Sequence, residues 1–271
     1  QGDGQTFTIS GQTNGSYYQS YNISFFDPWF GGKRPNAFSV SAYYSRQTDI
    51  SSQYYNSAYM NSYYNSYYSG MYGYGMYNYG NYNSYENYYD PDKSIQMYGL
   101  SLGWGKRLRW PDDYFTLSAE LSFQRFILKD WRYLYIRLNN GEYMSTGSCN
   151  NLSLGFTLSR NSTDNPIFPR SGSEFTASVH LTPPYSLFSD KDYATYGKND
   201  YDEAASVYNW IEYHKWKFKA KTYTALSNSN KCPVLMSRVE FGLLGHFNKH
   251  KKSPFETFDV GGDGMTGYST Y

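Results

Sequence analysis

The sequence predicts an all-β protein, a transmembrane antiparallel β-barrel segment of about nine strands. Three observations carry this prediction. Apolar and polar residues alternate in segments of roughly ten residues, the length of a strand that crosses a membrane. Aromatic residues make up 21% of the 271-residue chain and gather at the ends of these segments. The connections between segments alternate between long and short, as they do in outer-membrane barrels.

Composition excludes several other classes. Charged residues are only 17% of the chain and the net charge is +1, which argues against a charge-rich disordered chain and against a nucleic-acid binder. The longest uninterrupted apolar run is Tyr133–Ile136, whereas a spanning helix needs about 20 apolar residues. The two cysteines are too few for a disulfide scaffold or a cysteine-based zinc site.

The strands follow from alternation taken segment by segment. In Tyr114–Phe126, for example, Phe115, Leu117 and Ala119 share one face, and Thr116 shares the other face with small or polar residues. No segment shows a convincing helical pattern. The nine expected strands are Thr6–Gly11, Ser20–Phe26, Phe38–Tyr44, Tyr98–Trp104, Tyr114–Phe126, Leu152–Ser159, Glu174–Leu181, Ile211–Thr224 and Leu235–Phe247.

A soluble β-sandwich would also alternate, so the alternation leaves two architectures open. Two features favour the barrel. The polar face carries small side chains suited to contact with water, as expected inside a large barrel, and the apolar face has aromatic residues at its ends. These are Trp29, Phe30, Trp104, Trp110, Trp131, Tyr133, Tyr135 and Trp210.

Connection lengths give the barrel an orientation, because outer-membrane barrels place long loops outside and short turns in the periplasm. The expected extracellular loops are 45–93, 129–148, 183–208 and 248–271. The expected periplasmic turns hold Trp29, Gly31, Gly32, Lys33, Arg34, Trp110 and Pro111, with further turns at Pro166–Pro169 and Ser229–Asn230.

Loop 45–93 contains a low-complexity segment in which 15 of the 40 residues 51–90 are tyrosine. Tyrosine mixed with Ser, Gly and Asn is typical of adaptable binding surfaces. The loop is therefore either a contact surface for a partner or a variable surface loop that tolerates drift. The residues of the first interpretation are Tyr63, Tyr64, Tyr67, Tyr68, Tyr72 and Tyr74.

Four lysines at a spacing of two occupy one face of one expected strand. Trp216 and Phe218 lie on its other face, so the lysines are expected to face the lumen, where they need counter-charges. Two interpretations remain: a structural network that holds an inserted loop, and the lining of an anion-selective channel. The expected network consists of Lys215, Lys217, Lys219, Lys221, Arg238, Glu120, Glu174 and Glu240.

No catalytic constellation is present in the sequence. The four histidines show no metal-ligand or triad spacing, and His180 and His246 are expected to face the lumen. Gly261–Gly264 lacks the helix and Lys-Ser/Thr of a phosphate loop. Cys149 and Cys232 are expected at opposite barrel ends and therefore free, because a disulfide needs Cα atoms within about 7 Å. We expect no enzyme activity and no cofactor.

The odd strand count suggests an interior piece of a longer chain, because bacterial single-chain barrels close with an even number of strands. Residue 1 falls almost inside a strand and Tyr271 falls inside a loop. The same reasoning expects a signal peptide in the precursor.

Five segments resemble the BamA family, the central subunits of the outer-membrane barrel-assembly machinery, in its Bacteroidota form. The resemblance spans nearly the whole chain except the Tyr-rich loop, with the same order and spacing. The segments are Tyr21–Pro35 (YNISFFDPWFGGKRP), Gly103–Tyr114 (GWGKRLRWPDDY), Leu158–Glu174 (LSRNSTDNPIFPRSGSE), Glu212–Lys221 (EYHKWKFKAK) and Ser253–Tyr268 (SPFETFDVGGDGMTGY).

The resemblance implies a sixteen-stranded barrel, preceded by periplasmic POTRA domains, with a lateral seam between its first and last strands. This chain would cover strands 3–11, and 248–271 would begin the sixth extracellular loop, which folds into the lumen. The family's Arg-Gly loop motif is absent from this sequence. The loop base carried over is Phe255, Phe258, Gly261, Gly262, Asp263, Gly264, Gly267 and Tyr268.

The implied function is the folding and insertion of client β-barrels by strand templating at the seam. The implied partners are outer-membrane lipid, periplasmic and surface subunits of the assembly complex, and unfolded clients, with no nucleic acid. The alternative is a passive outer-membrane porin or transporter barrel.

Overall fold

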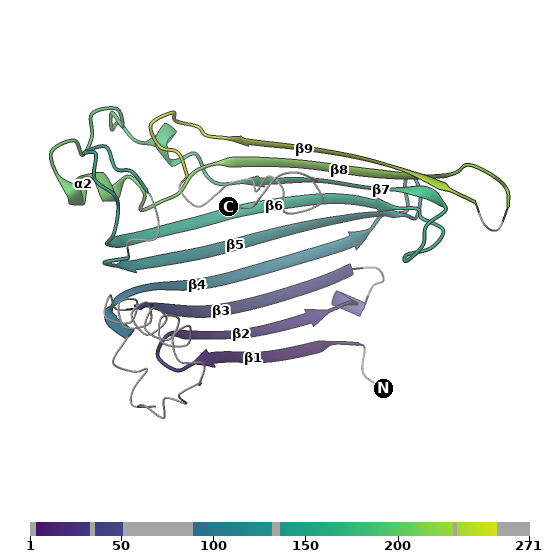
Figure 1. Ribbon diagram of the computed structural model, residues 1–271, viewed down its shortest axis with the longest axis horizontal. Helices are drawn as coiled ribbons and strands as arrows, with labels where there is room; N and C mark the ends of the chain where they lie inside the picture. The colour runs from purple at the N-terminus through teal and green to yellow at the C-terminus, as the bar shows by residue number, and fades with distance from the viewer. Residues whose placement is uncertain (1–3, 33–35, 51–88, 132–135, 230–231, 254–271) are drawn as a thin grey trace, which may run out of the picture.

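The computed structural model describes residues 4–32, 36–50, 89–131, 136–229 and 232–253. Within these residues, nine strands form one antiparallel sheet in chain order, each strand pairing with its sequence neighbours (Figure 1). The predicted all-β fold is confirmed. The strands are β1 (Thr6–Asn14), β2 (Tyr18–Asp27), β3 (Asn36–Ile50), β4 (Tyr89–Arg107), β5 (Phe115–Lys129), β6 (Gly147–Asn161), β7 (Ser171–Leu181), β8 (His214–Ala225) and β9 (Val234–Gly245).

Strand register aligns the apolar residues of neighbouring strands on one face of the sheet. Leu102 pairs with Leu121, and Leu121 pairs with Leu154. These leucines stay 39%, 44% and 39% exposed, because no second layer covers this face in the described part of the chain. A soluble sandwich would bury such a continuous apolar surface. The apolar face is therefore the lipid-facing side of a barrel segment, as the sequence predicted.

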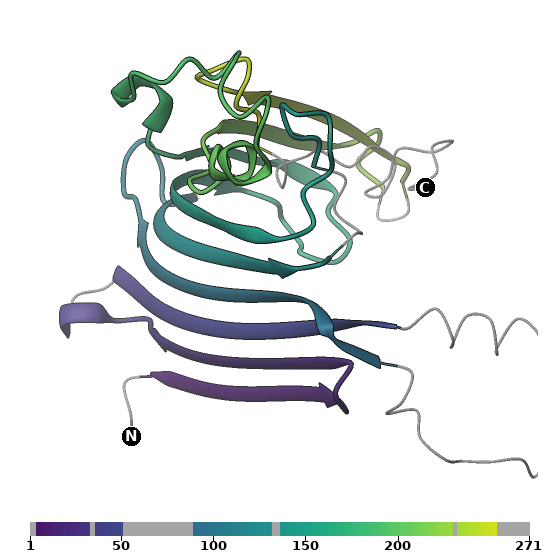
Figure 2. The ribbon, with the colours of Figure 1, turned by 90° about the vertical axis from the view of Figure 1, so that its left-hand side faces the viewer.

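The other face carries small polar side chains. One register row of it carries Ser41, Ser101, Ser122 and Ser153. The hydroxyl oxygens of Ser41 and Ser101 lie 2.7 Å apart, and those of Ser122 and Ser153 lie 2.6 Å apart. The sheet curls strongly, and α2 (Tyr201–Ser206) lies within the curve (Figure 2). We call the polar face, which lines this curve, the inner face.

Gly99 allows a tyrosine to lie flat across the inner face. The Tyr43 ring covers Gly99, so that a Cβ built there would clash with Tyr43 Cε1. Gly99 pairs with Gln124 on the next strand, and the Tyr43 side chain hydrogen-bonds to Gln124. The glycine thus lets one side chain join β3 to β5 across β4.

Gly99→Ala should therefore lower the free energy of unfolding by about 1–3 kcal/mol, the usual cost of forcing atoms into a packed site. Urea unfolding of the refolded protein in detergent micelles measures it. Gly105→Ala is the matched control, because a Cβ at Gly105 meets Ala37 Cβ at an ordinary 3.8 Å. Equal losses for the two variants would contradict the explanation.

The connections sort to the two ends of the sheet by length, apart from the Gly15–Tyr17 turn between β1 and β2. One end, here the short-turn end, carries 28–32, 108–114, 162–170, 226–229 and 232–233. At the other, the long-loop end, β3 ends and β4 begins, and 130–131, 136–146, 182–213 and 246–253 lie there. Strands β3 and β4 occupy both ends of the predicted loop 45–93, and its centre lies outside the described residues.

The expectation of no helix is wrong in the long loops. There, α2 begins after Asp200, whose carboxylate accepts the Asp202 N–H at 3.0 Å, and a 3-10 turn, η3, spans Tyr185–Phe188. A six-residue helix is too short to show a helical period. A second 3-10 turn, η1 (Phe30–Gly32), follows β2. In the part of the chain that the structure describes, no helix is long and apolar enough to cross a membrane.

Candidate functional site: the inner face and its capped end

Strand β8 places its four lysines on the inner face, with Trp216 and Phe218 on the lipid-facing side. Lys219 Nζ lies 3.0 Å from Glu240 on β9, and Lys221 Nζ lies 3.8 Å from Glu174 on β7. Arg238 binds the same Glu240 oxygen through Nη2 at 2.6 Å. Cross-strand pairing thus brings together two lysines of β8, Arg238 and two of the three expected glutamates. These residues are Lys219, Lys221, Arg238, Glu174 and Glu240.

Glu120 lies in the same inner face but at a distance from that group. Its register row runs through Gly155 and His180 to Lys215. The His180 ring leans over Gly155, where a Cβ would lie 2.9 Å from Nδ1. Among the described residues, no ion pair within 4.0 Å includes Glu120. The structure therefore separates Glu120 from the other two glutamates.

The ion pairs of the inner face are partly exposed, with side chains from 27% to 44% accessible. Pairs of this kind contribute roughly 0–1 kcal/mol each, because water screens them. What these pairs change is the distribution of charge on the inner face. Each glutamate neutralises a cation of the ladder, which reduces the positive field that an anion-selective lining would need.

The inner face ends in an apolar cap at the long-loop end, which the sequence did not predict. The described residues of loop 130–146 and the loop 182–213 fold over β5 and β6 and bury a core against them. Its buried residues are Leu128, Trp131, Ile136, Leu138, Met144, Cys149, Ala204, Ala205, Ile211 and Tyr213. The sequence signals were short apolar stretches, most of them outside the predicted strands, with Ile211 and Tyr213 at the start of the predicted strand Ile211–Thr224.

Polar contacts join the two loops of the cap to each other. Asn139 Nδ2 donates to the carbonyl oxygens of Tyr193 and Tyr196 at 2.9 and 3.0 Å. The Tyr201 hydroxyl accepts the Ser145 N–H and the Thr146 N–H, both at 3.0 Å. The loops therefore form one body rather than two independent flaps.

Glu212 and Lys251 form a buried ion pair at the edge of the cap. Lys251 Nζ lies 3.9 Å from Glu212 Oε2, and the two side chains are 5% and 0% exposed. Oε2 also accepts the Ser186 N–H at 2.7 Å. Burial lowers the pKa of Lys251, and the Glu212 carboxylate opposes that change. This pair ties the chain after β9 to the loop 182–213.

His246 adds a pH-sensitive group to the same segment, just beyond the end of β9. Partial burial lowers its pKa, and Lys252 and His214 act in the same direction. The unfolded chain then binds the proton more tightly than the folded chain. The free energy of unfolding should fall as pH drops from above 6.5 through the lowered pKa. Unfolding curves at a series of pH values should show a shallower fall for His246→Gln; an unchanged slope would contradict this.

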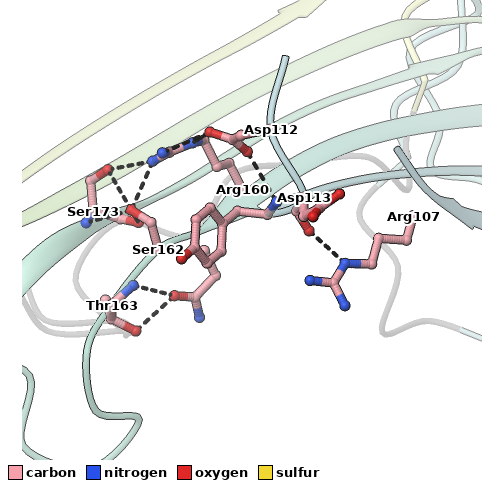
Figure 3. A network of polar contacts seen from close by, with 9 residues as sticks. Arg107, Asp112, Asp113, Arg160, Ser162, Thr163 and Ser173 are labelled. Carbon is pink, nitrogen blue, oxygen red and sulfur yellow. Dashed lines mark hydrogen bonds and ion pairs between the residues drawn. The ribbon is translucent and has the colours of Figure 1, made fainter. Parts of the chain in front are cut away.

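At the short-turn end, Arg160 of β6 holds three elements together (Figure 3). Its Nη2 lies 2.9 Å from Asp112 Oδ2 in the β4–β5 connection, and its Nη1 donates to Ser162 and Ser173 at 2.8 and 3.0 Å. Arg107 donates to the Asp113 carbonyl oxygen beside it. Two of the segments that carry the family resemblance, 103–114 and 158–174, meet at this arginine.

The expected turn residues lie at the short-turn end where they are described. Trp29 donates its N–H to Asp27 Oδ1, and Gly31 and Gly32 adopt φ of 72° and 67°, which favours glycine. Trp110 is exposed, next to Pro111. Lys33, Arg34, the six expected contact tyrosines and the expected loop base from Phe255 to Tyr268 lie outside the described residues.

Both cysteines are free, as predicted, with Cys149 in the cap and Cys232 at the short-turn end. Cys232 Sγ accepts a hydrogen bond from Arg170 at 3.2 Å, which lowers the pKa of this thiol. Among the described residues, no cluster of three His, Cys, Asp or Glu side chains has the arrangement of a metal site.

Comparison with known proteins gives the family. The model described as "Omp85 superfamily domain" matches residues 1–270. No curated protein matches the chain. Among solved structures, the fold is similar to that of BamA from Haemophilus ducreyi lacking POTRA domains 1–3, with a TM-score of 0.52 and 15% sequence identity. The similarity covers 93% of this chain and 37% of that chain.

At 15% identity, the likeness to BamA shows the fold, and this chain spans little more than a third of the length of that solved chain. The family match and the similar fold confirm the resemblance to BamA that was drawn from the five segments. The Bacteroidota type stays a prediction. The family match covers nearly every residue. The chain therefore belongs to the Omp85 superfamily, and its nine strands are part of an outer-membrane β-barrel.

Proposed function

We propose that this chain is part of the barrel of an assembly factor that folds client β-barrel proteins and inserts them into the outer membrane. The observation that carries the proposal is the capped inner face. A buried apolar core closes over β5 and β6 at the long-loop end, and the lysine ladder below it is partly neutralised by Glu174 and Glu240. A passive pore needs an open, hydrated path at that end.

The proposed mechanism is strand templating. Unpaired backbone groups cost several kcal/mol each in lipid, so a client strand gains by pairing with an exposed strand edge. A seam between the first and last strands of the complete barrel would offer that edge by β-augmentation. No residue of the nine strands described here is assigned to the seam.

The proposed partners are unfolded outer-membrane clients and the periplasmic and surface subunits of an assembly complex. The lysine ladder and its glutamates are proposed as a structural network that holds the loop 248–271 in the lumen. The six tyrosines of loop 45–93 are proposed as a surface contact, and the long-loop end is proposed to be extracellular, since outer-membrane barrels place long loops outside.

Depletion of the full-length protein in its own organism tests the function. Many unrelated barrel proteins should disappear from the outer membrane together, which quantitative proteomics of membrane fractions measures. Loss of a single nutrient's uptake, with other barrels unchanged, would overturn the proposal.

A passive porin or transporter is the competing function, because the inner face carries five expected network cations against three carboxylates. Planar bilayers that contain the purified protein distinguish the two. Assembly predicts small, irregular currents; a large and steady anion-selective conductance would favour the porin.

A further inference from the structure

The turn η3 in loop 182–213 exposes two large apolar side chains. Leu187 is 68% exposed and Phe188 is 83% exposed, whereas the adjacent Ser186 is buried. Isolated exposed apolar residues are common on proteins, so exposure by itself says little. What distinguishes these two residues is the side of the sheet on which η3 lies.

Aromatic contacts connect η3 to the lipid-facing side. The segment around Trp210 runs beside the start of β6, where Asn150 donates its N–H to the Asn209 carbonyl at 2.9 Å and accepts the Ile211 N–H at 2.9 Å. Ile211 points into the cap, so Trp210 points to the opposite side.

There the Trp210 ring lies 6.5 Å from the ring of Phe123, a lipid-facing residue of β5, and 5.1 Å from the ring of Tyr185 in η3. A chain of rings thus leads from the lipid-facing belt to η3.

The backbone of η3 has its donors satisfied. Tyr185 N–H donates to the Pro183 carbonyl at 2.9 Å, Leu187 N–H to the Pro184 carbonyl at 3.0 Å, and Ser186 N–H to Glu212. Pro183 and Pro184 carry no N–H. Such a turn can enter an apolar medium without exposing unpaired donors, which are costly there.

The charge beneath η3 is also neutralised. Glu212 lies two residues from Trp210, on the same side of the chain, and is fully covered. Lys251 pairs with it, and the Tyr185 and Tyr193 rings lie 5.7 and 5.3 Å from Lys251 Nζ. The turn η3 therefore exposes apolar side chains, and the charged groups that it covers balance each other.

We propose that η3 is a membrane anchor, in which Leu187 and Phe188 enter the boundary between lipid headgroups and acyl chains at the long-loop end. The partner is the lipid itself, because η3 continues the lipid-facing belt through Phe123, Trp210 and Tyr185. Amphipathic segments bind membranes at this depth by burying apolar side chains. The anchor fixes the height of the cap relative to the bilayer and does not depend on the proposed assembly function.

Fluorescence quenching by lipids tests the anchor in the full-length protein reconstituted into phosphatidylcholine and phosphatidylglycerol vesicles. Phe188→Cys carries an environment-sensitive label in a Cys232→Ser background, in which the remaining Cys149 is buried. Asp202→Cys on the exposed side of α2, within the curve, is the matched control, and Phe241→Cys on the lipid-facing side of β9 is the positive control. Some lipids carry a nitroxide near the headgroup end of the acyl chain.

The label at 188 should be quenched severalfold more than the label at 202, and close to the label at 241. Quenching at 188 by aqueous iodide and not by lipid nitroxide would overturn the proposal. Shielding from both quenchers would also overturn it, since another protein chain would then cover η3. Leu187→Cys repeats the test if the Phe188 variant fails to fold.

Discussion

Replacing Glu212 with alanine should lower the free energy of unfolding by about 3 kcal/mol, the cost of leaving one partner of a buried ion pair uncompensated. Lys251 would keep its charge in a site where its side chain is only 5% exposed, and the Ser186 N–H would lose its acceptor. We expect a loss of stability at the lower end of the range that is usual for broken buried ion pairs, because Glu212 Oε1 already lacks a hydrogen-bond partner among the described residues. Urea unfolding in micelles, followed by tryptophan fluorescence, measures the loss.

Glu174→Ala is the control for this loss. Its partner Lys221 lies at a similar distance, 3.8 Å, but both side chains are about one-third exposed, so the cost should stay below about 1 kcal/mol. Adding Lys251→Met to Glu212→Ala should recover part of the stability, because the unpaired charge is removed. Equal losses for Glu212→Ala and Glu174→Ala would show that burial does not govern this pair.

Leu121→Lys should cost about 2–4 kcal/mol, the penalty for a lysine on the lipid face near the midplane of a barrel. Leu121 lies in the middle of β5 between Leu102 and Leu154, in the leucine row of the lipid-facing side. Refolding into lipid vesicles at increasing urea measures the loss, since the penalty exists only in a bilayer.

The neighbouring Glu120→Lys introduces the same side chain on the inner face of the same strand. Glu120 is exposed there and has no ion-pair partner among the described residues, so this change should cost less than about 1 kcal/mol. If Glu120→Lys proved the more costly of the two, the assignment of faces would be reversed.

Part of the candidate site could be predicted because strand alternation is local information. Residues two apart in a strand point to the same side, so Lys219 and Lys221 share one face wherever the strand lies. The register then brings Glu240 and Glu174 opposite them, as β9 and β7 are the sequence neighbours of β8. Glu120 was grouped with them by the same alternation, but alternation carries no information on distance across a sheet.

Glu212 shows what alternation leaves out. The predicted strand Ile211–Thr224 would place this carboxylate on the lipid-facing side, where it would be costly. The structure begins β8 at His214, covers Glu212 with η3 and pairs it with Lys251 from the segment after β9. These contacts join positions far apart in the chain, and nothing in the local pattern marks them.

The sequence by itself determined the nine strands, their lipid-facing and inner faces and the ends to which the connections belong, because each of these depends on residues next to one another in a strand or turn. Only the tertiary structure decided that the loops 130–146 and 182–213 form one apolar cap, that Glu212 and Lys251 are buried together, and that η3 lies beside the lipid-facing belt. The physical reason is that irregular loops have no period. Their burial depends on which surfaces meet after the sheet has curled, and that meeting is settled by long-range packing.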